Sequence, residues 1–248
     1  MKDQQLLRFS RQIMLPEMDV AGQQKLVDAT VLIVGMGGLG CPAAMYLAAA
    51  GVGHLTIADD DTVELTNLQR QIAHSQSDLG VSKVASAEAT LKGLNPDVKI
   101  TSLARRLLGE ELDQVVAGVD IVVDACDNFS TRFAVNRSCV KHRKPLVSGA
   151  AIRMEGQVAV FDSRDPSSPC YQCLYGQGDD EDASCSQNGV MAPLVGIIGA
   201  VQAMETIKVI TGIGDSLAGR LLLLDATTMQ WREMKLPRDS HCPACSRP

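Results

Sequence analysis

The sequence predicts an α/β fold in which a mostly parallel sheet is doubly wound, with helices on both of its faces. Short apolar runs rich in β-branched residues alternate with longer segments of helical period through residues 30–147. Most of these runs are apolar throughout, as is typical of strands that are covered on both faces. Right-handed crossovers between parallel strands then place helices on the two sides of the sheet.

The first three strands follow one another with helices between them. Residues 30–34 (TVLIV) form a β-branched run that ends at a glycine, and residues 39–50 form a helical segment rich in small residues. Residues 55–58 predict the second strand. The helical period of residues 81–94 stops at an Asn-Pro pair, and the alternation of residues 98–103 predicts the third strand. This order is that of two successive βαβ units.

The same order continues as far as residue 147. A helix is expected at residues 109–117, a buried strand at 120–124 (DIVVD), a further helix at 130–142 and a short strand at 145–147. A polar, helical segment precedes the first strand.

The pattern is less regular after residue 150. Strands are expected at residues 157–161 and 220–224, with residues 231–236 beside them in an antiparallel hairpin or meander, and a helix at residues 195–210. Residues 163–186 are rich in Pro, Ser, Gly and Asp and predict a loop.

Length and composition suit one soluble domain, residues 1–248, with halves at 1–150 and 151–248. The formal charge of −6 argues against nucleic-acid binding, which needs clustered Lys and Arg. No segment is read as a signal peptide or a membrane span, so we expect no membrane association and a cytoplasmic location. Eight cysteines in such a chain indicate thiols or metal ligands rather than disulfides.

A glycine-rich turn joins the first predicted strand to the first helix. Gly35, Gly37 and Gly40 form a G-x-G-x-x-G pattern, at which backbone amides and a helix N-terminus can approach phosphate groups. Asp59 lies 19 positions after Gly40, where an acidic side chain can accept hydrogen bonds from a ribose. The pattern is typical of Rossmann-like nucleotide sites, with NAD as the usual ligand; a tight turn without a ligand is the alternative.

Four cysteines form two C-x-x-C pairs, Cys170 with Cys173 and Cys242 with Cys245, separated by 68 residues. Four thiolates make a closed tetrahedral Zn²⁺ site, which holds distant segments together and leaves no open position for catalysis. A redox dithiol is the alternative for either pair alone, but two matched pairs favour a structural zinc site.

Polar side chains near other strand ends extend the expected nucleotide site. The segment TNLQRQ at residues 66–71 contains Arg70, Lys83 begins a helix, and Asp127 follows the strand at 120–124. Parallel α/β sheets bind ligands beyond the carboxyl ends of their strands, so these side chains should converge. Two cations beside a triphosphate and a carboxylate that holds Mg²⁺ suit transfer at phosphorus, which favours ATP over NAD. Each residue alone could equally form a surface ion pair or a helix cap.

Eight segments carry a resemblance to one family, and several of them are long and family-specific: RFSRQI at 8–13, GMGGLG at 35–40, TNLQRQ at 66–71, CDNFSTR at 126–132, SGAAIRMEGQ at 148–157, CYQC at 170–173, GVMAPLVGIIG at 189–199 and CPAC at 242–245. In these segments the sequence resembles the ThiF/MoeB/HesA adenylyltransferases, bacterial relatives of the ubiquitin-activating enzymes, over nearly its whole length.

The resemblance implies that ATP and Mg²⁺ bind in the cleft and that the C-terminal Gly-Gly carboxylate of a ubiquitin-like sulfur-carrier protein attacks the α-phosphate. Pyrophosphate would leave and an acyl-adenylate would form, with the zinc-held half 151–248 binding the carrier. Asp127, Arg70 and Lys83 would take part in catalysis. The expected nucleotide-binding residues are Gly35, Gly37, Gly38, Gly40, Asp59, Asp61, Thr66, Asn67, Leu68, Gln69, Arg70, Lys83, Asp127 and Asn128.

Two further catalytic residues are implied by the resemblance. Arg11 resembles the arginine that reaches into the partner subunit's ATP site, which implies a homodimer with shared active sites. Cys185 matches the cysteine that joins covalently to the carrier in ThiF-type members and is a bystander in MoeB-type members. A sulfurtransferase or a cysteine desulfurase is a possible further partner. IADDD at 57–61 favours the thiamine branch and SGAAIRMEGQ favours the molybdopterin branch, so either carrier, or both, stays open.

Two other functions stay open on sequence alone. A zinc-stabilised NAD-dependent oxidoreductase would use the glycines and Asp59 but would leave Arg70, Lys83 and Asp127 without a role. A noncatalytic partner-binding module, such as the degenerate half of a heterodimeric activating enzyme, would not be expected to keep both Arg70 and Asp127.

Overall fold

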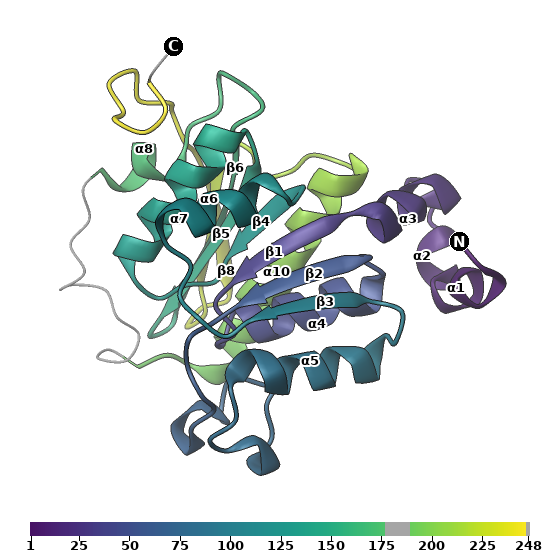
Figure 1. Ribbon diagram of the computed structural model, residues 1–248. Coiled ribbons are helices and arrows are strands. Elements are labelled where there is room, and N and C mark those ends of the chain that lie inside the picture. Colours follow the sequence, from purple (N-terminus) through teal and green to yellow (C-terminus); the bar gives the residue numbers. More distant parts are fainter. Residues whose placement is uncertain (177–188, 247–248) are drawn as a thin grey trace.

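The computed structural model describes residues 1–176 and 189–246, through which one eight-stranded sheet runs in the order β3-β2-β1-β4-β5-β6-β7-β8 (Figure 1). The first five strands are parallel: β1 (Thr30–Val34), β2 (His54–Ala58), β3 (Lys99–Leu103), β4 (Ile121–Asp124) and β5 (Pro145–Ile152). The last three continue the sheet in antiparallel pairs: β6 (Glu155–Asp162), β7 (Arg220–Asp225) and β8 (Gln230–Lys235). The predicted doubly wound, mostly parallel sheet with antiparallel strands at its C-terminal end is confirmed.

Helices cover both faces of the sheet (Figure 1). One face carries α4 (Gly40–Ala50), α5 (Lys83–Leu94) and α10 (Ala192–Thr211), and the other carries α6 (Gly109–Ala117), α7 (Phe129–His142) and the short α8 (Tyr171–Tyr175). Three N-terminal helices precede β1: α1 (Asp3–Arg8), α2 (Ser10–Ile13) and α3 (Asp19–Asp28). Two 3₁₀ turns connect β2 to α5: η1 (Leu65–Asn67) and η2 (Gln76–Asp78).

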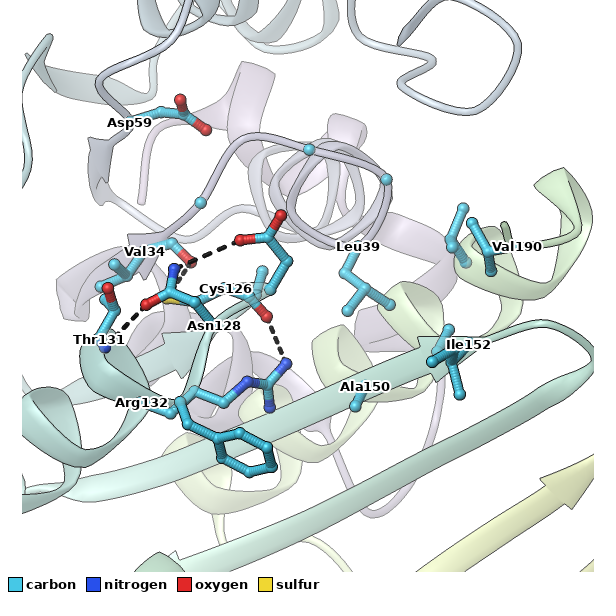
Figure 2. Close-up of a pocket in the computed structure, with 18 of the residues that line it drawn as sticks. Val34, Leu39, Asp59, Cys126, Asn128, Thr131, Arg132, Ala150, Ile152 and Val190 are labelled. Carbon is cyan, nitrogen blue, oxygen red and sulfur yellow. Dashed lines mark hydrogen bonds between the residues drawn. The ribbon is translucent and has the colours of Figure 1, made fainter. Parts of the chain in front are cut away.

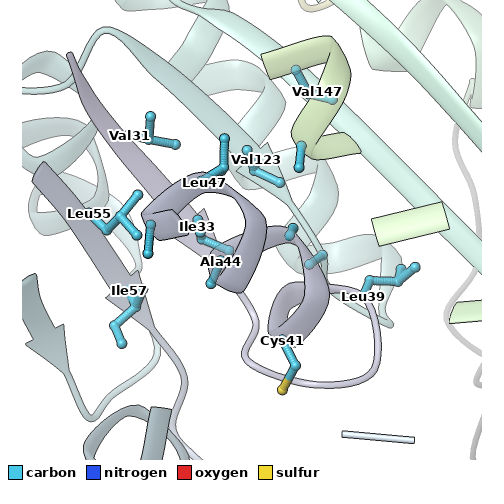
Figure 3. Packing of buried hydrophobic residues seen from close by; sticks show 14 of the residues in the cluster. Val31, Ile33, Leu39, Cys41, Ala44, Leu47, Leu55, Ile57, Val123 and Val147 are labelled. Carbon is cyan, nitrogen blue, oxygen red and sulfur yellow. The ribbon is translucent and has the colours of Figure 1, made fainter. Parts of the chain in front are cut away.

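The central strands β1 and β4 are almost entirely apolar because both of their faces are buried. Along β1, Val31 and Ile33 belong to one apolar cluster and Leu32 and Val34 to the other, as the alternation of side chains in a strand requires. Figure 3 shows the first cluster, in which residues of β1, β2, β4 and β5 pack around α4. The small residues of α4 let this helix lie close to the sheet, which brings its N-terminus to the end of β1.

Two predicted boundaries are corrected. The strand expected at 145–147 extends to Ile152, because it pairs along its whole length with β6 in a hairpin that places Arg153 in the left-handed region (φ 53°). The loop expected at 163–186 contains α8, a turn of helix that begins between two cysteines. The division into halves at residue 150 stays a prediction.

Helix α10 has the length and mean hydropathy, 20 residues and 1.5, that a membrane span requires, which the sequence analysis did not anticipate. Half of this helix is buried within the described protein, where it packs on α4, β5 and β6. Its apolar character is therefore accounted for by its position as a core helix.

Candidate active site

A cavity of about 360 Å³ lies at the carboxyl ends of β1, β2 and β4. Figure 2 shows Asp59 and Asn128 toward one end of it, and Ile152 and Val190 toward the other. Nine of the residues expected to bind nucleotide line this cavity: Gly35, Gly37, Gly38, Asp59, Asp61, Arg70, Lys83, Asp127 and Asn128. The structure therefore brings these residues together, although they come from five separate segments of the chain.

The glycine turn depends on the absence of side chains at two positions. Gly35 has φ +95°, and a Cβ there would lie 2.7 Å from the carbonyl oxygen of Ala125. A Cβ on Gly40 would lie 1.8 Å from the carbonyl oxygen of Gly35. Gly40 does not line the cavity, so its place in the pattern is explained by the packing of the turn on the start of α4.

Asp59 holds the glycine turn from the end of β2. Its Oδ2 accepts a hydrogen bond of 2.6 Å from the backbone amide of Met36, and its Oδ1 accepts one of 2.9 Å from the amide of Asp61. Burial raises the pKa of the Asp59 carboxyl, while Lys83 and the two amides act in the opposite direction. The carboxylate thus fixes both the turn and the loop after β2.

Two cations face the cavity beside the glycine turn. The Lys83 ammonium lies 2.7 Å from Oδ2 of Asp61, and its side chain is 7% exposed. The Arg70 guanidinium donates to the carbonyl of Thr66 at 3.0 Å, which fixes the arginine within its own loop. Two cationic side chains are therefore available, beside the carboxylates of residues 59–61, on the side of the cavity where phosphate groups would lie next to backbone amides.

Asp127 and Asn128 follow β4 and line the same cavity. Asn128 caps α7, because its Oδ1 accepts a hydrogen bond of 2.9 Å from the backbone amide of Thr131 (Figure 2). Asp127 is exposed and lines the cavity. A solvent-accessible carboxylate of this kind offers the hard oxygen ligands that Mg²⁺ prefers.

A buried ion pair supports this side of the cavity. Arg132 of α7 lies 3.3 Å from Asp124 at the end of β4, and Ser148 of β5 donates to the same carboxylate at 2.7 Å. Arg132 also donates to the carbonyls of Cys126 and Gly149 (the first shown in Figure 2). These bonds tie α7 to β4 and β5, so the loop that carries Asp127 is held at both ends.

Several expected residues do not line the cavity. Asn67 is buried and its Oδ1 accepts from the amide of Glu64 at 3.1 Å, so its side chain closes a turn of η1. Arg11 is exposed on α2. The others are Gly40, Thr66, Leu68 and Gln69, and Cys185 lies outside the described residues. The nucleotide-binding and catalytic roles of these residues stay predictions.

Sequence analysis missed other residues that line the cavity. Arg105 and Arg106 follow the carboxyl end of β3, so the rule that located Asp59 and Asp127 could have found them. Gln71 is the last residue of TNLQRQ, and its buried Oε1 has no hydrogen-bond partner among residues 1–176 and 189–246. Tyr175 and Gln157, which are hydrogen-bonded to each other, come from the irregular second half, where no periodic pattern indicated them.

The four predicted zinc ligands lie together. The Sγ atoms of Cys170, Cys173, Cys242 and Cys245 are all within 4.8 Å of one another. Three of the separations are 3.4, 3.6 and 3.9 Å. A tetrahedron of thiolates around Zn²⁺ requires about 3.8 Å between sulfurs, whereas a disulfide requires about 2.05 Å. The donor set therefore fits a tetrahedral metal ion.

A comparison with known families decides the classification. The model of the ThiF family matches residues 9–244. The chain belongs to the ThiF family. It is 48% identical to the molybdopterin-synthase adenylyltransferase of Escherichia coli (strain K12) over 247 residues, which is 100% of this chain and 99% of the relative. It is 44% identical to the sulfur carrier protein ThiS adenylyltransferase of the same organism over 245 residues, 99% of this chain and 97% of the relative.

A solved structure supports the fold of this ThiF-family chain. The crystal structure of E. coli MccB with ATP superposes with a TM-score of 0.83 over 96% of this chain and 73% of that chain, at 24% identity. This likeness confirms the architecture. The family membership confirms the resemblance that the sequence motifs indicated.

Proposed function

We propose that this protein is an ATP-dependent adenylyltransferase that activates the C-terminal carboxylate of a ubiquitin-like sulfur-carrier protein. The observation that carries the proposal is the single cavity in which the glycine turn, Asp59, Arg70, Lys83 and Asp127 lie together. Relatives that align over the whole chain, at 48% and 44% identity, are both named as adenylyltransferases.

The reaction needs positioning and charge compensation rather than a protein nucleophile. An oxygen of the carrier's terminal carboxylate forms a bond to the α-phosphorus of ATP, and the bond from that phosphorus to the bridging oxygen of the β-phosphate breaks. Acyl-adenylate and pyrophosphate result. The incoming carboxylate and the phosphates repel each other, so Arg70 and Lys83 act by neutralising charge that increases on the leaving pyrophosphate.

Two metal sites complete the proposal. Asp127 would hold Mg²⁺, which would supply further charge neutralisation at the phosphates. The thiolates of Cys170, Cys173, Cys242 and Cys245 would hold Zn²⁺ and so join α8 to the C-terminal segment. Asn136 of α7 donates to Sγ of Cys170 at 3.6 Å and accepts from the amide of Tyr171 at 2.9 Å, which links this cluster to the helix that follows Asp127.

The far end of the cavity suits the tail of the carrier. Small and apolar groups line it, including Ala150, Ala151, Ile152, Gly156 and Leu223. A lining of this kind would accommodate a tail of glycine residues. The carrier would be of the thiamine or the molybdopterin branch, since the two E. coli relatives are named for ThiS and for molybdopterin synthase.

We propose further that the protein is a homodimer with shared active sites and that it is located in the cytoplasm. A sulfurtransferase or a cysteine desulfurase would be a further partner. Arg11 is exposed on α2 outside the cavity of its own chain, as a residue that serves a second copy would be. Mixing Arg11→Ala with Asp127→Ala protein should restore part of the activity, because hybrid dimers contain one intact composite site. No recovery after subunit exchange would overturn the shared site.

Mass spectrometry tests the function directly. The protein is incubated with ATP, Mg²⁺ and either a ThiS-like or a MoaD-like carrier, and the carrier mass is read before and after. We expect a carrier with added AMP, and none when the carrier lacks its terminal glycine. An NAD-dependent oxidoreductase or a noncatalytic module would give no such product with either carrier.

A further inference from the structure

A chain of buried polar groups lies beneath the glycine turn. His74 is 7% exposed and lies in the segment between η1 and η2. Its Nε2 lies 3.1 Å from the carbonyl oxygen of Met36, and its Nδ1 lies 2.8 Å from Oγ of Ser86 on α5. Ser86 in turn lies 3.0 Å from Oδ2 of Asp78. The imidazole therefore connects the turn to η2 and to the helix that begins with Lys83.

Both peptide groups that flank Met36 are held by hydrogen bonds. The Met36 amide donates to Asp59 at 2.6 Å, and the Met36 carbonyl accepts from His74 and, at 3.3 Å, from the Sγ of Cys41. Both neighbours of Met36, Gly35 and Gly37, line the cavity. Glycines have little preference of their own for one backbone conformation, so these bonds decide which way the amides of the turn point.

The hydrogen-bond partners of His74 indicate that its Nε2 carries a proton. The Met36 carbonyl can only accept, so the Nε2 of His74 must donate. In the neutral ring, Nδ1 accepts from the Ser86 hydroxyl, whose single proton is then not available to Asp78. The Oδ2 of Asp78 still accepts from the amide and the hydroxyl of Ser75. The contact with the Cys41 thiol, at 3.6 Å, is long for a hydrogen bond and adds little.

We propose that His74 is a positioning residue for adenylation, which holds the Met36 carbonyl so that the amides of the glycine turn face the phosphates of ATP. The inference rests on the proposed function for its substrate. His74 itself does not line the cavity and touches neither ATP nor carrier in this account. Its effect is on nucleotide affinity, transmitted through one backbone peptide.

Two isosteric variants separate this role from packing. Glutamine places an amide nitrogen near the position of Nε2 and keeps the donor to Met36. Asparagine places its amide nitrogen near Nδ1, keeps a polar contact toward Ser86 and loses the donor to Met36. His54→Gln is the matched control, since His54 is bonded to Thr101 at 2.9 Å on neighbouring strands away from the glycine turn.

The first measurement is the Kd for ATP in the presence of Mg²⁺, by calorimetry on the full chain without carrier. The second measurement is the KM for ATP and the KM for the carrier. His74→Asn should weaken ATP binding by about 3- to 10-fold, the effect of one buried hydrogen bond. His74→Gln and His54→Gln should stay within about 2-fold of the wild type by the same measure. The KM for the carrier should not change in any of them.

Thermal midpoints and metal content identify variants that are merely misfolded. Equal Kd values for the Asn and Gln variants, whether both unchanged or both weakened, would overturn the proposal, because the donor to Met36 would then be irrelevant. ATP binding is measured without the carrier, so this result is independent of whether the protein adenylates a sulfur carrier.

Discussion

The ammonium group of Lys83 lies 2.7 Å from the carboxylate of Asp61 at the cavity, and the two side chains differ greatly in exposure, 7% against 66%. A buried ammonium requires a partner of opposite charge, whereas an exposed carboxylate can exchange that partner for water at low cost. Asp61 therefore holds the lysine in place, and a phosphate group can replace the carboxylate as its partner.

Replacement of Lys83 should remove most of the adenylation activity. Lys83→Ala is expected to lower kcat/KM by about 100- to 1,000-fold, as the loss of one preorganised group that stabilises developing charge does. Lys92→Ala is the control, because Lys92 belongs to the same helix, pairs with Glu88 at 2.9 Å and does not line the cavity. Steady-state release of pyrophosphate measures both, and equal activities of the two variants would contradict the role of Lys83.

Adjacent residues after β4 should have separable effects. Asp127→Ala should lower kcat by about 100-fold or more, because a carboxylate that serves the reacting phosphates is lost. Asn128→Ala should lower the free energy of unfolding by about 0.5–2 kcal/mol, since it removes the cap of α7, and Asn128→Ser should restore most of it. Urea unfolding measures the second effect. An Asp127→Ala protein with normal adenylation would contradict the assignment.

Loss of a cysteine ligand should release the metal. Cys242→Ser is expected to reduce the zinc content from about one ion per chain to a small fraction and to lower the thermal midpoint, because the C-terminal segment and α8 lose their link. Cys139→Ser is a control, because Cys139 is buried in α7 outside the four-cysteine cluster. Full metal and stability in the Cys242 variant would contradict the clamp.

His74 should make stability depend on pH. Burial lowers the pKa of His74, so the unfolded chain, with a value of about 6.5, binds this proton more readily than the folded protein. The stabilisation is fully present above pH 6.5 and is lost as the pH falls through the lowered value. His74→Gln should therefore lose less stability than the wild type between pH 7.5 and 5.5. Equal losses in urea titrations would contradict this.

Much of the fold was predictable because its central strands are buried on both faces. Uninterrupted apolar runs such as residues 30–34 and 120–124 identified their strands, and the carboxyl-end rule placed Asp59 and Asp127 at one cavity. Helix α8 was not predicted, because its position depends on Cys170 and Cys173 facing a distant cysteine pair rather than on local helical period.

Side-chain direction was the part of the site that the sequence could not supply. Asn67 and Asn128 belong to residue types that either bind a ligand or close a turn, and in the structure both accept hydrogen bonds from nearby backbone amides. His74 shows no spacing that marks it in the sequence. Its contact with Met36 arises only when the segment before α5 folds back beneath the glycine turn.

Exchange of labelled pyrophosphate into ATP tests most directly whether this cavity activates a carboxylate. With Mg²⁺ and a carrier that ends in Gly-Gly, we predict rapid exchange, and with the same carrier shortened by its last glycine we predict none. Exchange that does not depend on the carrier, or a complete absence of exchange with carriers of both branches, would contradict the account.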